Sequence, residues 1–159
     1  MSSRPRSAAL DVELVPFAAL SAPDLYAVLA LRQRVFVVEQ QCAFLDADGR
    51  DAAAEHLLMR DGPELAAYLR VLAPGAQFDT FTIGRVVVSP ERRGEQLGRR
   101  VMEEGIRRVQ GARGPVAISV GAQARLERFY ASLGFVRVSE LYDEDGIPHI
   151  DMRRGPGGG

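Results

Sequence analysis

The chain has 159 residues, of which 47% are hydrophobic and 26% are charged, a composition typical of one soluble globular domain. Its 20 basic and 21 acidic residues give a net charge of −1, so no bulk attraction to nucleic acid is expected. The single cysteine, Cys42, excludes an internal disulfide and a cysteine-based zinc cluster. No apolar run approaches the ~20 residues that span a bilayer, and no signal-peptide core follows the N-terminus. We therefore expect a cytoplasmic protein without a membrane partner.

In chain order, residues 1–8 are expected to be disordered, residues 9–154 to form one domain, and residues 155–159 to form a flexible glycine-rich tail. Alternating apolar residues predict a first strand over 10–17. Ser21 or Asp24 is placed to cap a helix that continues to about Val38. Residues 39–54 are acidic and predict a loop.

The second half of the pattern alternates hairpins with strand–helix–strand units. Asp61-Gly62 and Asp145-Gly146 are turn signals, and Gly134 is typical of a residue that ends a helix. The predicted elements are strands over 55–60, 65–72 and 82–88, a helix over 95–111, a strand over 115–120, a helix over 124–133, and strands over 135–138 and 148–152. This order predicts an α/β (α+β) fold with a mixed sheet and helices on both faces.

The segment from Ile83 to Met102 is the strongest local signal for a ligand site. An apolar strand ends at Ser89-Pro90, a basic turn with Gly94 follows, and a helix opens near Gly98. The first N–H groups of a helix lack partners within it and carry partial positive charge, so they suit a pyrophosphate. A glycine-bearing turn of this kind is a plain connection between strand and helix about as often as it is a phosphate site.

The spacing of Arg93, Gly94 and Gly98 resembles the acetyl-CoA pyrophosphate loop of the GNAT acetyltransferases, whose pattern is Arg/Gln-x-x-Gly-x-Gly/Ala. Gln96 replaces the middle glycine. A residue in the right-handed helical conformation can hold its side chain away from the ligand, so the backbone donors would remain available. The resemblance implies that residues Arg93, Gly94, Glu95, Gln96, Leu97 and Gly98 hold the pyrophosphate.

A second motif lies downstream, where Tyr130 is followed by Gly134-Phe135. Alone, this motif is typical of an amphipathic helix whose aromatic residues face the core and which ends at a glycine. It also resembles a GNAT signature whose tyrosine lies near the CoA sulfur and is often assigned as general acid, because a departing thiolate needs a proton. Gln123 matches the position where the family often has an asparagine that contacts the cofactor.

A third segment contains Asp46, Asp48-Gly49 and Asp51. The calcium-loop alternative lacks a correctly spaced bidentate glutamate, so we expect no metal. A solvated acidic turn is the plain reading; the functional alternative is that these carboxylates attract a cationic amine. Residues 140–152, together with 36–40, 93–95 and 120–124, are similar to the ElaA-like subgroup of the GNAT family, and the resemblance covers about residues 10–154.

The general base is less well defined. Some GNAT enzymes have a glutamate on the central strand where this chain has Thr82. The candidates are Glu39, His56 and His149, each of which could equally be structural. Cys42 is not favoured as a nucleophile, because direct transfer needs no acyl-enzyme.

The resemblance implies a GNAT fold: a mixed, mostly antiparallel sheet of about seven strands, splayed at the cofactor cleft and flanked by about four helices. The backbone of Val86, Val87 and Val88 would hold the pantetheine arm, with Gln123 and Tyr130 near the sulfur. It implies transfer of an acetyl group from acetyl-CoA, by direct attack in a ternary complex, to a primary amine of a small or peptide acceptor. The alternatives are a longer acyl group or a non-catalytic CoA-binding sensor. The resemblance is compatible with a homodimer, because many relatives pair, and nothing in the sequence excludes a monomer.

Overall fold

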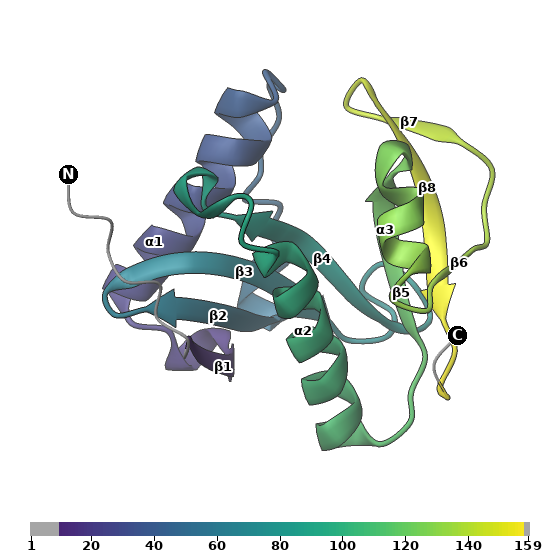
Figure 1. Ribbon diagram of the computed structural model, residues 1–159, viewed down its shortest axis with the longest axis horizontal. Coiled ribbons are helices and arrows are strands. Elements are labelled where there is room, and N and C mark those ends of the chain that lie inside the picture. The colour runs from purple at the N-terminus through teal and green to yellow at the C-terminus, as the bar shows by residue number, and fades with distance from the viewer. Residues whose placement is uncertain (1–9, 158–159) are drawn as a thin grey trace.

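The computed structural model describes residues 10–157, so the expected disordered segment 1–8 and the last two residues of the tail lie outside it. Over the described residues, eight strands form one sheet in the order β1-β2-β3-β4-β5-β8-β6, with β7 paired to β8 (Figure 1). The strands are β1 Asp11–Pro16, β2 Glu55–Asp61, β3 Glu64–Leu72, β4 Phe81–Val88, β5 Ile118–Gln123, β6 Val136–Arg137, β7 Tyr142–Glu144 and β8 Ile147–Arg154. The helices are α1 Ala22–Arg32, α2 Leu97–Arg113 and α3 Glu127–Ala131.

The expected fold class is confirmed, with differences in several elements. The sheet has eight strands rather than about seven, because the short, exposed β7 was not predicted, and the described part of the chain has three α-helices rather than about four. Ser21 caps α1, its Oγ accepting from the N–H of Asp24 at 3.1 Å. The expected helix to Val38 continues past α1 as a π-helical segment, Gln33–Glu39. None of the described helices is long and apolar enough to cross a membrane.

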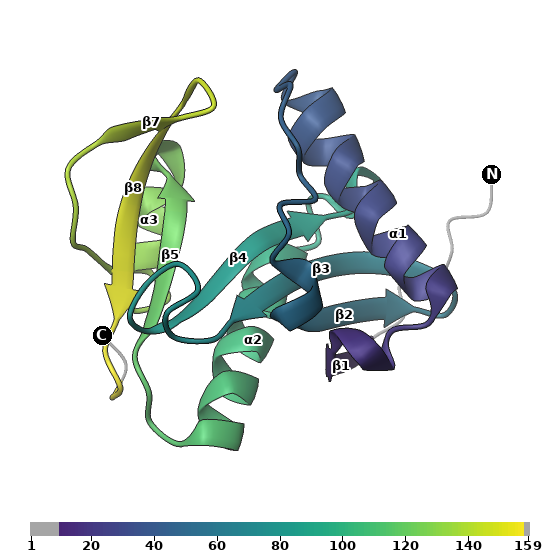
Figure 2. The same cartoon turned by 180° about the vertical axis from the view of Figure 1, so that it is seen from behind.

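The two faces of the sheet carry separate cores. Figures 1 and 2 show α1 on one face and α2 on the other. Val28 and Leu31 of α1 pack with Leu58, Tyr68 and Val87. The apolar face of α2 packs against the opposite side of β2, β3 and β4, and there it joins the larger core that includes Tyr130. Burial of these apolar faces fixes which side of each strand packs against each helix.

The sheet splays between β4 and β5, the one parallel pair among the described strands. Only Phe81 and Thr82 of β4 pair with β5, at Ile118 and Ser119. Beyond Thr82, β4 remains paired with β3, while β5 remains paired with β8 up to Gln123. The β5-facing edge of β4 therefore lacks a strand partner over most of its length, as the resemblance implied.

A β-bulge lies on β4 at the same place. Tyr68 pairs with Val87 and Arg70 pairs with Gly84, so Leu69 stands opposite two residues of β4, 85 and 86. The first of these has φ of +50°, a left-handed conformation that non-glycine residues rarely adopt. Such bulges re-aim side chains and interrupt the ladder, and they are frequent next to ligand sites.

Candidate functional site

The predicted phosphate loop joins β4 to α2. Gly94 has φ of +88°, and Gln96 has φ of +59° immediately before α2 begins at Leu97. The expectation that Gln96 would be right-handed is wrong: it adopts the left-handed conformation that a glycine takes without strain. A Cβ on Gly98 would come no closer than 3.9 Å to the methyl group of Val88. A side chain at Gly98 would therefore have room beside Val88.

Ion pairs hold this loop against its neighbours. Arg92 Nε donates to Glu95 at 2.9 Å, and its Nη1 donates to Asp61 at 3.1 Å. Arg93 Nη2 donates to Glu39 at 2.5 Å, across to the π-helical segment. A second link to that segment joins Arg34 to Glu91. Glu39, a candidate base, is thus placed beside the phosphate loop.

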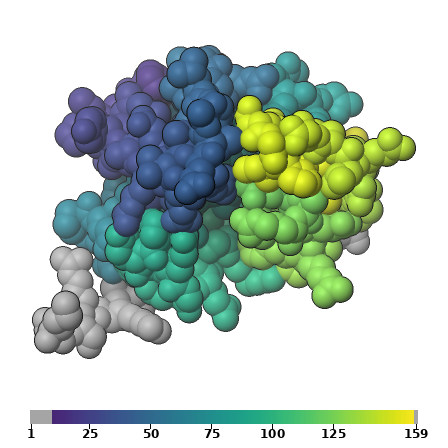
Figure 3. Space-filling model, turned by 90° about the horizontal axis from the view of Figure 1, so that it is seen from above, coloured from purple at the N-terminus to yellow at the C-terminus, as the bar shows by residue number. Residues whose placement is uncertain are grey.

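A cavity of about 410 Å³ lies in the splay between β4 and β5. Its walls come from β4, β5, the 40–50 loop and the β7–β8 hairpin. Figure 3 shows the segment that carries this loop, in blue, meeting the hairpin, in yellow. The link is polar, because Cys42 Sγ donates to the carbonyl oxygen of Asp145 at 3.2 Å. Four of the predicted site residues line this cavity: Val86, Gln123, Tyr130 and His149.

Tyr130 enters this cavity from α3. Its side chain is 7% exposed and packs edge-on against Phe129 and Phe135. Burial raises the pKa of the Tyr130 phenol to about 12. The hydroxyl therefore stays protonated at neutral pH, which is the state that a proton donor requires.

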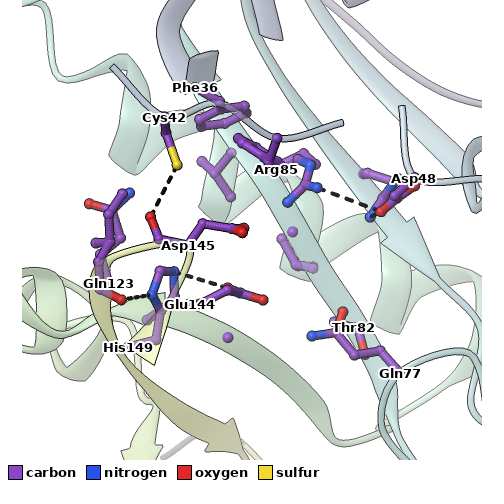
Figure 4. A pocket seen from close by; sticks show the side chains of 18 of the residues that line it. Phe36, Cys42, Asp48, Gln77, Thr82, Arg85, Gln123, Glu144, Asp145 and His149 are labelled. Atoms are coloured by element: carbon purple, nitrogen blue, oxygen red, sulfur yellow. Dashed lines mark hydrogen bonds and ion pairs between the residues drawn. The ribbon is translucent and has the colours of Figure 1, made fainter. Parts of the chain in front are cut away.

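The two histidines have different surroundings. His56 is fully buried on β2, with Nδ1 2.7 Å from the Tyr68 hydroxyl and Nε2 2.9 Å from the carbonyl oxygen of Asp51. Burial lowers the pKa of His56, and it does not line the cavity. His149 lines the cavity from β8 (Figure 4). Its Nδ1 donates to the carbonyl oxygen of Ile147 at 2.7 Å, and Nε2 lies 3.2 Å from Glu144.

The carboxylates of the acidic loop are all paired with arginines, and Asp46 is buried, although residues 47–50 beside it are exposed. Arg32 Nε donates to Asp46 at 2.7 Å, and Arg32 Nη1 donates to Asp51 at 2.7 Å. Arg70 donates to both oxygens of Asp48 at 2.8 Å. Burial alone would raise the pKa of Asp48, but these hydrogen bonds hold it well below its ordinary value of 3.8.

A third arginine completes this cluster. Arg85 Nε lies 2.9 Å from Asp46, and its guanidinium lies over the rings of Phe36 and Phe44 at 5.9 and 5.6 Å. Sequence reasoning missed Arg70 and Arg85 as cavity residues. The sequence did contain a signal for Arg85. A single charged residue within an apolar strand needs an ion-pair partner or a polar cavity, and Arg85 is such a residue.

Comparison with known proteins identifies the family and the fold. A family model described as the acetyltransferase (GNAT) domain matches residues 33–155. The ElaA protein of Escherichia coli K12 is 44% identical over 137 residues, which cover 85% of this chain and 90% of ElaA. The crystal structure of E. coli ElaA matches with a TM-score of 0.85 and 40% identity, covering 92% of this chain and 99% of that chain. The crystal structure of an acyl-CoA N-acyltransferase from Pseudomonas aeruginosa matches with a TM-score of 0.88 and 41% identity, covering 92% of this chain and 100% of that chain. The chain is therefore an acyltransferase that belongs to the GNAT family and is similar to ElaA.

Proposed function

We propose that this acyltransferase uses acetyl-CoA and transfers the acetyl group to a primary amine bound in the cavity between β4 and β5. One observation carries the proposal: the splay brings the β4 bulge, Tyr130 and His149 to a single cavity. A thioester, an amine, a proton donor and a proton acceptor could meet there. Holding two reactants in one site makes their reaction effectively intramolecular.

The edge of β4 and the loop after it fit acetyl-CoA. Beyond Thr82 the β5-facing edge of β4 lacks a strand partner, so the backbone of Val86, Val87 and Val88 can bond the pantetheine amides as an added strand would. At the end of β4, the loop from Arg93 to Gly98 offers the pyrophosphate the first amides of α2. The Arg93 side chain is 49% exposed and can turn from Glu39 to a phosphate. The bound thioester supplies an activated acyl carbonyl.

The residues of the cavity supply the proton transfers. The amine nitrogen forms the new C–N bond as the C–S bond breaks, the amine loses a proton, and the sulfur gains one. His149 is suited to exchange the amine proton at Nε2, because its ring lines the cavity and its Nδ1 is held by the carbonyl oxygen of Ile147. Glu144 would then stabilise the imidazolium. Tyr130 is suited to protonate the sulfur, and backbone N–H groups at the β4 bulge could polarise the acyl carbonyl.

A thiol-release assay with acetyl-CoA and a panel of amines tests this proposal. Tyr130→Phe should lower kcat about 100-fold while leaving the Kd for acetyl-CoA within twofold of wild type. The matched control is Tyr26→Phe, which removes a hydroxyl from a side chain that is 79% exposed, and should change neither value. A protein that binds acetyl-CoA but releases no thiol with any amine of the panel would be a CoA-binding sensor instead.

A further inference from the structure

Opposite charges face each other across the cavity. Arg85 projects from the β4 side, and Glu144 and Asp145 project from the β7–β8 hairpin (Figure 4). Asp48, the other carboxylate in the wall, is held by both terminal nitrogens of Arg70. The β4 side of the cavity therefore presents a guanidinium group, held in an ion-pair cluster, and the hairpin side presents carboxylates.

Arg85 is held in place for contact with a ligand. Its backbone is fixed at the bulge, and its guanidinium lies between Phe36 and Phe44. The side chain is 26% exposed, and its two ion pairs use Nε, at 2.9 Å from Asp46, and Nη2, at 3.6 Å from Asp48. An arginine fixed by packing and ion pairs loses little further entropy when it binds an anion.

Two buried polar atoms on the same side lack partners. Thr82 is 1% exposed and Arg70 is 2% exposed, and both line the cavity. Within the described part of the chain, Thr82 Oγ1 and Arg70 Nε have no hydrogen-bond partner. Gly84, between Arg70 and Arg85, has open space where a Cβ would stand. Buried polar atoms in proteins are nearly always hydrogen-bonded, so two unpaired donors in side chains that line the cavity point to a ligand acceptor.

We propose that the acceptor is a small zwitterion, an amine that also carries a carboxylate. This inference rests on the proposed acetyl transfer and names its substrate class. The carboxylate would accept from Arg70 Nε, Thr82 Oγ1 and Arg85, and the amine would lie toward Glu144 and His149. A polyamine would place one of its cations against Arg85, which repels it. Charge complementarity at both ends selects molecules with both groups.

The test compares matched acceptors in the thiol-release assay. The panel contains the L-amino acids, an ω-amino acid series from β-alanine to 6-aminohexanoate, the primary amide of each, and putrescine and spermidine. At least one free acid should exceed its own amide in kcat/KM by about 30-fold, because the amide leaves the arginine unpaired. The ω-amino series measures the separation between the two groups.

Two variants connect the preference to these side chains. Thr82→Val keeps the shape and removes the hydroxyl, and should raise the acceptor KM about tenfold with the acetyl-CoA KM unchanged. Arg85→Gln should reduce the preference for acid over amide to within threefold. Arg107→Gln is the matched control, because Arg107 is 67% exposed on α2 and should leave the preference intact.

The outcomes separate the two proposals. Equal rates for acids and amides, turnover of putrescine and spermidine alone, or no turnover of any panel member while acetyl-CoA still binds would each overturn the zwitterion. Absence of acetyl-CoA binding would instead overturn the proposed function, and the inference would fall with it. A preference that survives Arg85→Gln would also contradict the assignment of the anion site.

Discussion

Asp51 connects two buried arginines beside the cavity, and its removal gives the clearest stability prediction. Its Oδ1 accepts from Arg32 Nη1 at 2.7 Å and from Arg70 Nη1 at 3.0 Å. Arg32 is 0% exposed and Arg70 is 2% exposed. Asp51→Asn keeps the shape of the side chain and removes the charge, so the cluster would retain an uncompensated buried cation.

The magnitude follows from the burial of the partners. Removing one member of a buried ion pair costs about 3–5 kcal/mol, because the remaining charge is neither solvated nor paired. Arg32 keeps Asp46, and Arg70 keeps Asp48, so the lower end applies. We expect Asp51→Asn to reduce the free energy of unfolding by about 3 kcal/mol and to lower Tm by about 6–12 °C.

Urea unfolding followed by circular dichroism measures this change. The control is Glu104→Gln, which removes the partly exposed partner that Arg107 and Arg108 share on α2 and should cost less than about 1 kcal/mol. A loss below about 1 kcal/mol for Asp51→Asn as well would refute the reasoning. It would mean that the aspartates behave as the solvated acidic turn that the sequence suggested.

The remaining predictions concern pH, the phosphate loop and the candidate base. The pKa values of His56, Asp48 and Asp51 are lower in the folded protein than their ordinary values of 6.5 and 3.8, so the folded state binds fewer protons. The free energy of unfolding should therefore fall as the pH drops below about 6.5 and fall again below about 3.8; urea titrations showing a gain between pH 7 and 5 would contradict this. Gln96→Gly should raise the free energy of unfolding by about 0.5 kcal/mol by relieving the left-handed backbone. A calorimetric loss of acetyl-CoA affinity above fivefold would show instead that the glutamine side chain binds. His149→Gln should lower kcat about 100-fold while leaving the Kd for acetyl-CoA within twofold of wild type. An unchanged kcat would exclude His149 as the base.

Local signals predicted most of the fold. The alternation in β1, the hairpin turn at Asp61-Gly62 and the Ser21 cap each depend on neighbouring residues, and the structure confirms all three elements. β7 was missed because Tyr142–Glu144 is three residues long, exposed on both faces and mostly polar, so it lacks an apolar pattern. Its position is set by pairing with β8.

The contents of the site depend on contacts that no local pattern encodes. The loop aspartates looked like a solvated turn because their partners, Arg32, Arg70 and Arg85, lie on α1, β3 and β4. His56 could not be separated from His149 by sequence, because its hydrogen bond to Tyr68 forms only when β2 pairs with β3. Sequence reasoning identified the residue types in the site but not which of them are paired with each other.

Calorimetric titration with acetyl-CoA, with Gly98→Glu and Gly98→Ala beside the wild type, tests the central claim most directly. A Cβ at Gly98 meets only the methyl group of Val88 at 3.9 Å, so both variants should fold, while the glutamate would place a negative charge where the pyrophosphate binds. We expect saturable one-to-one binding by the wild type, a change of less than threefold for Gly98→Ala and a loss of more than 30-fold for Gly98→Glu. Absence of binding by the wild type, or equal binding by Gly98→Glu, would contradict the assignment of this loop as the pyrophosphate site.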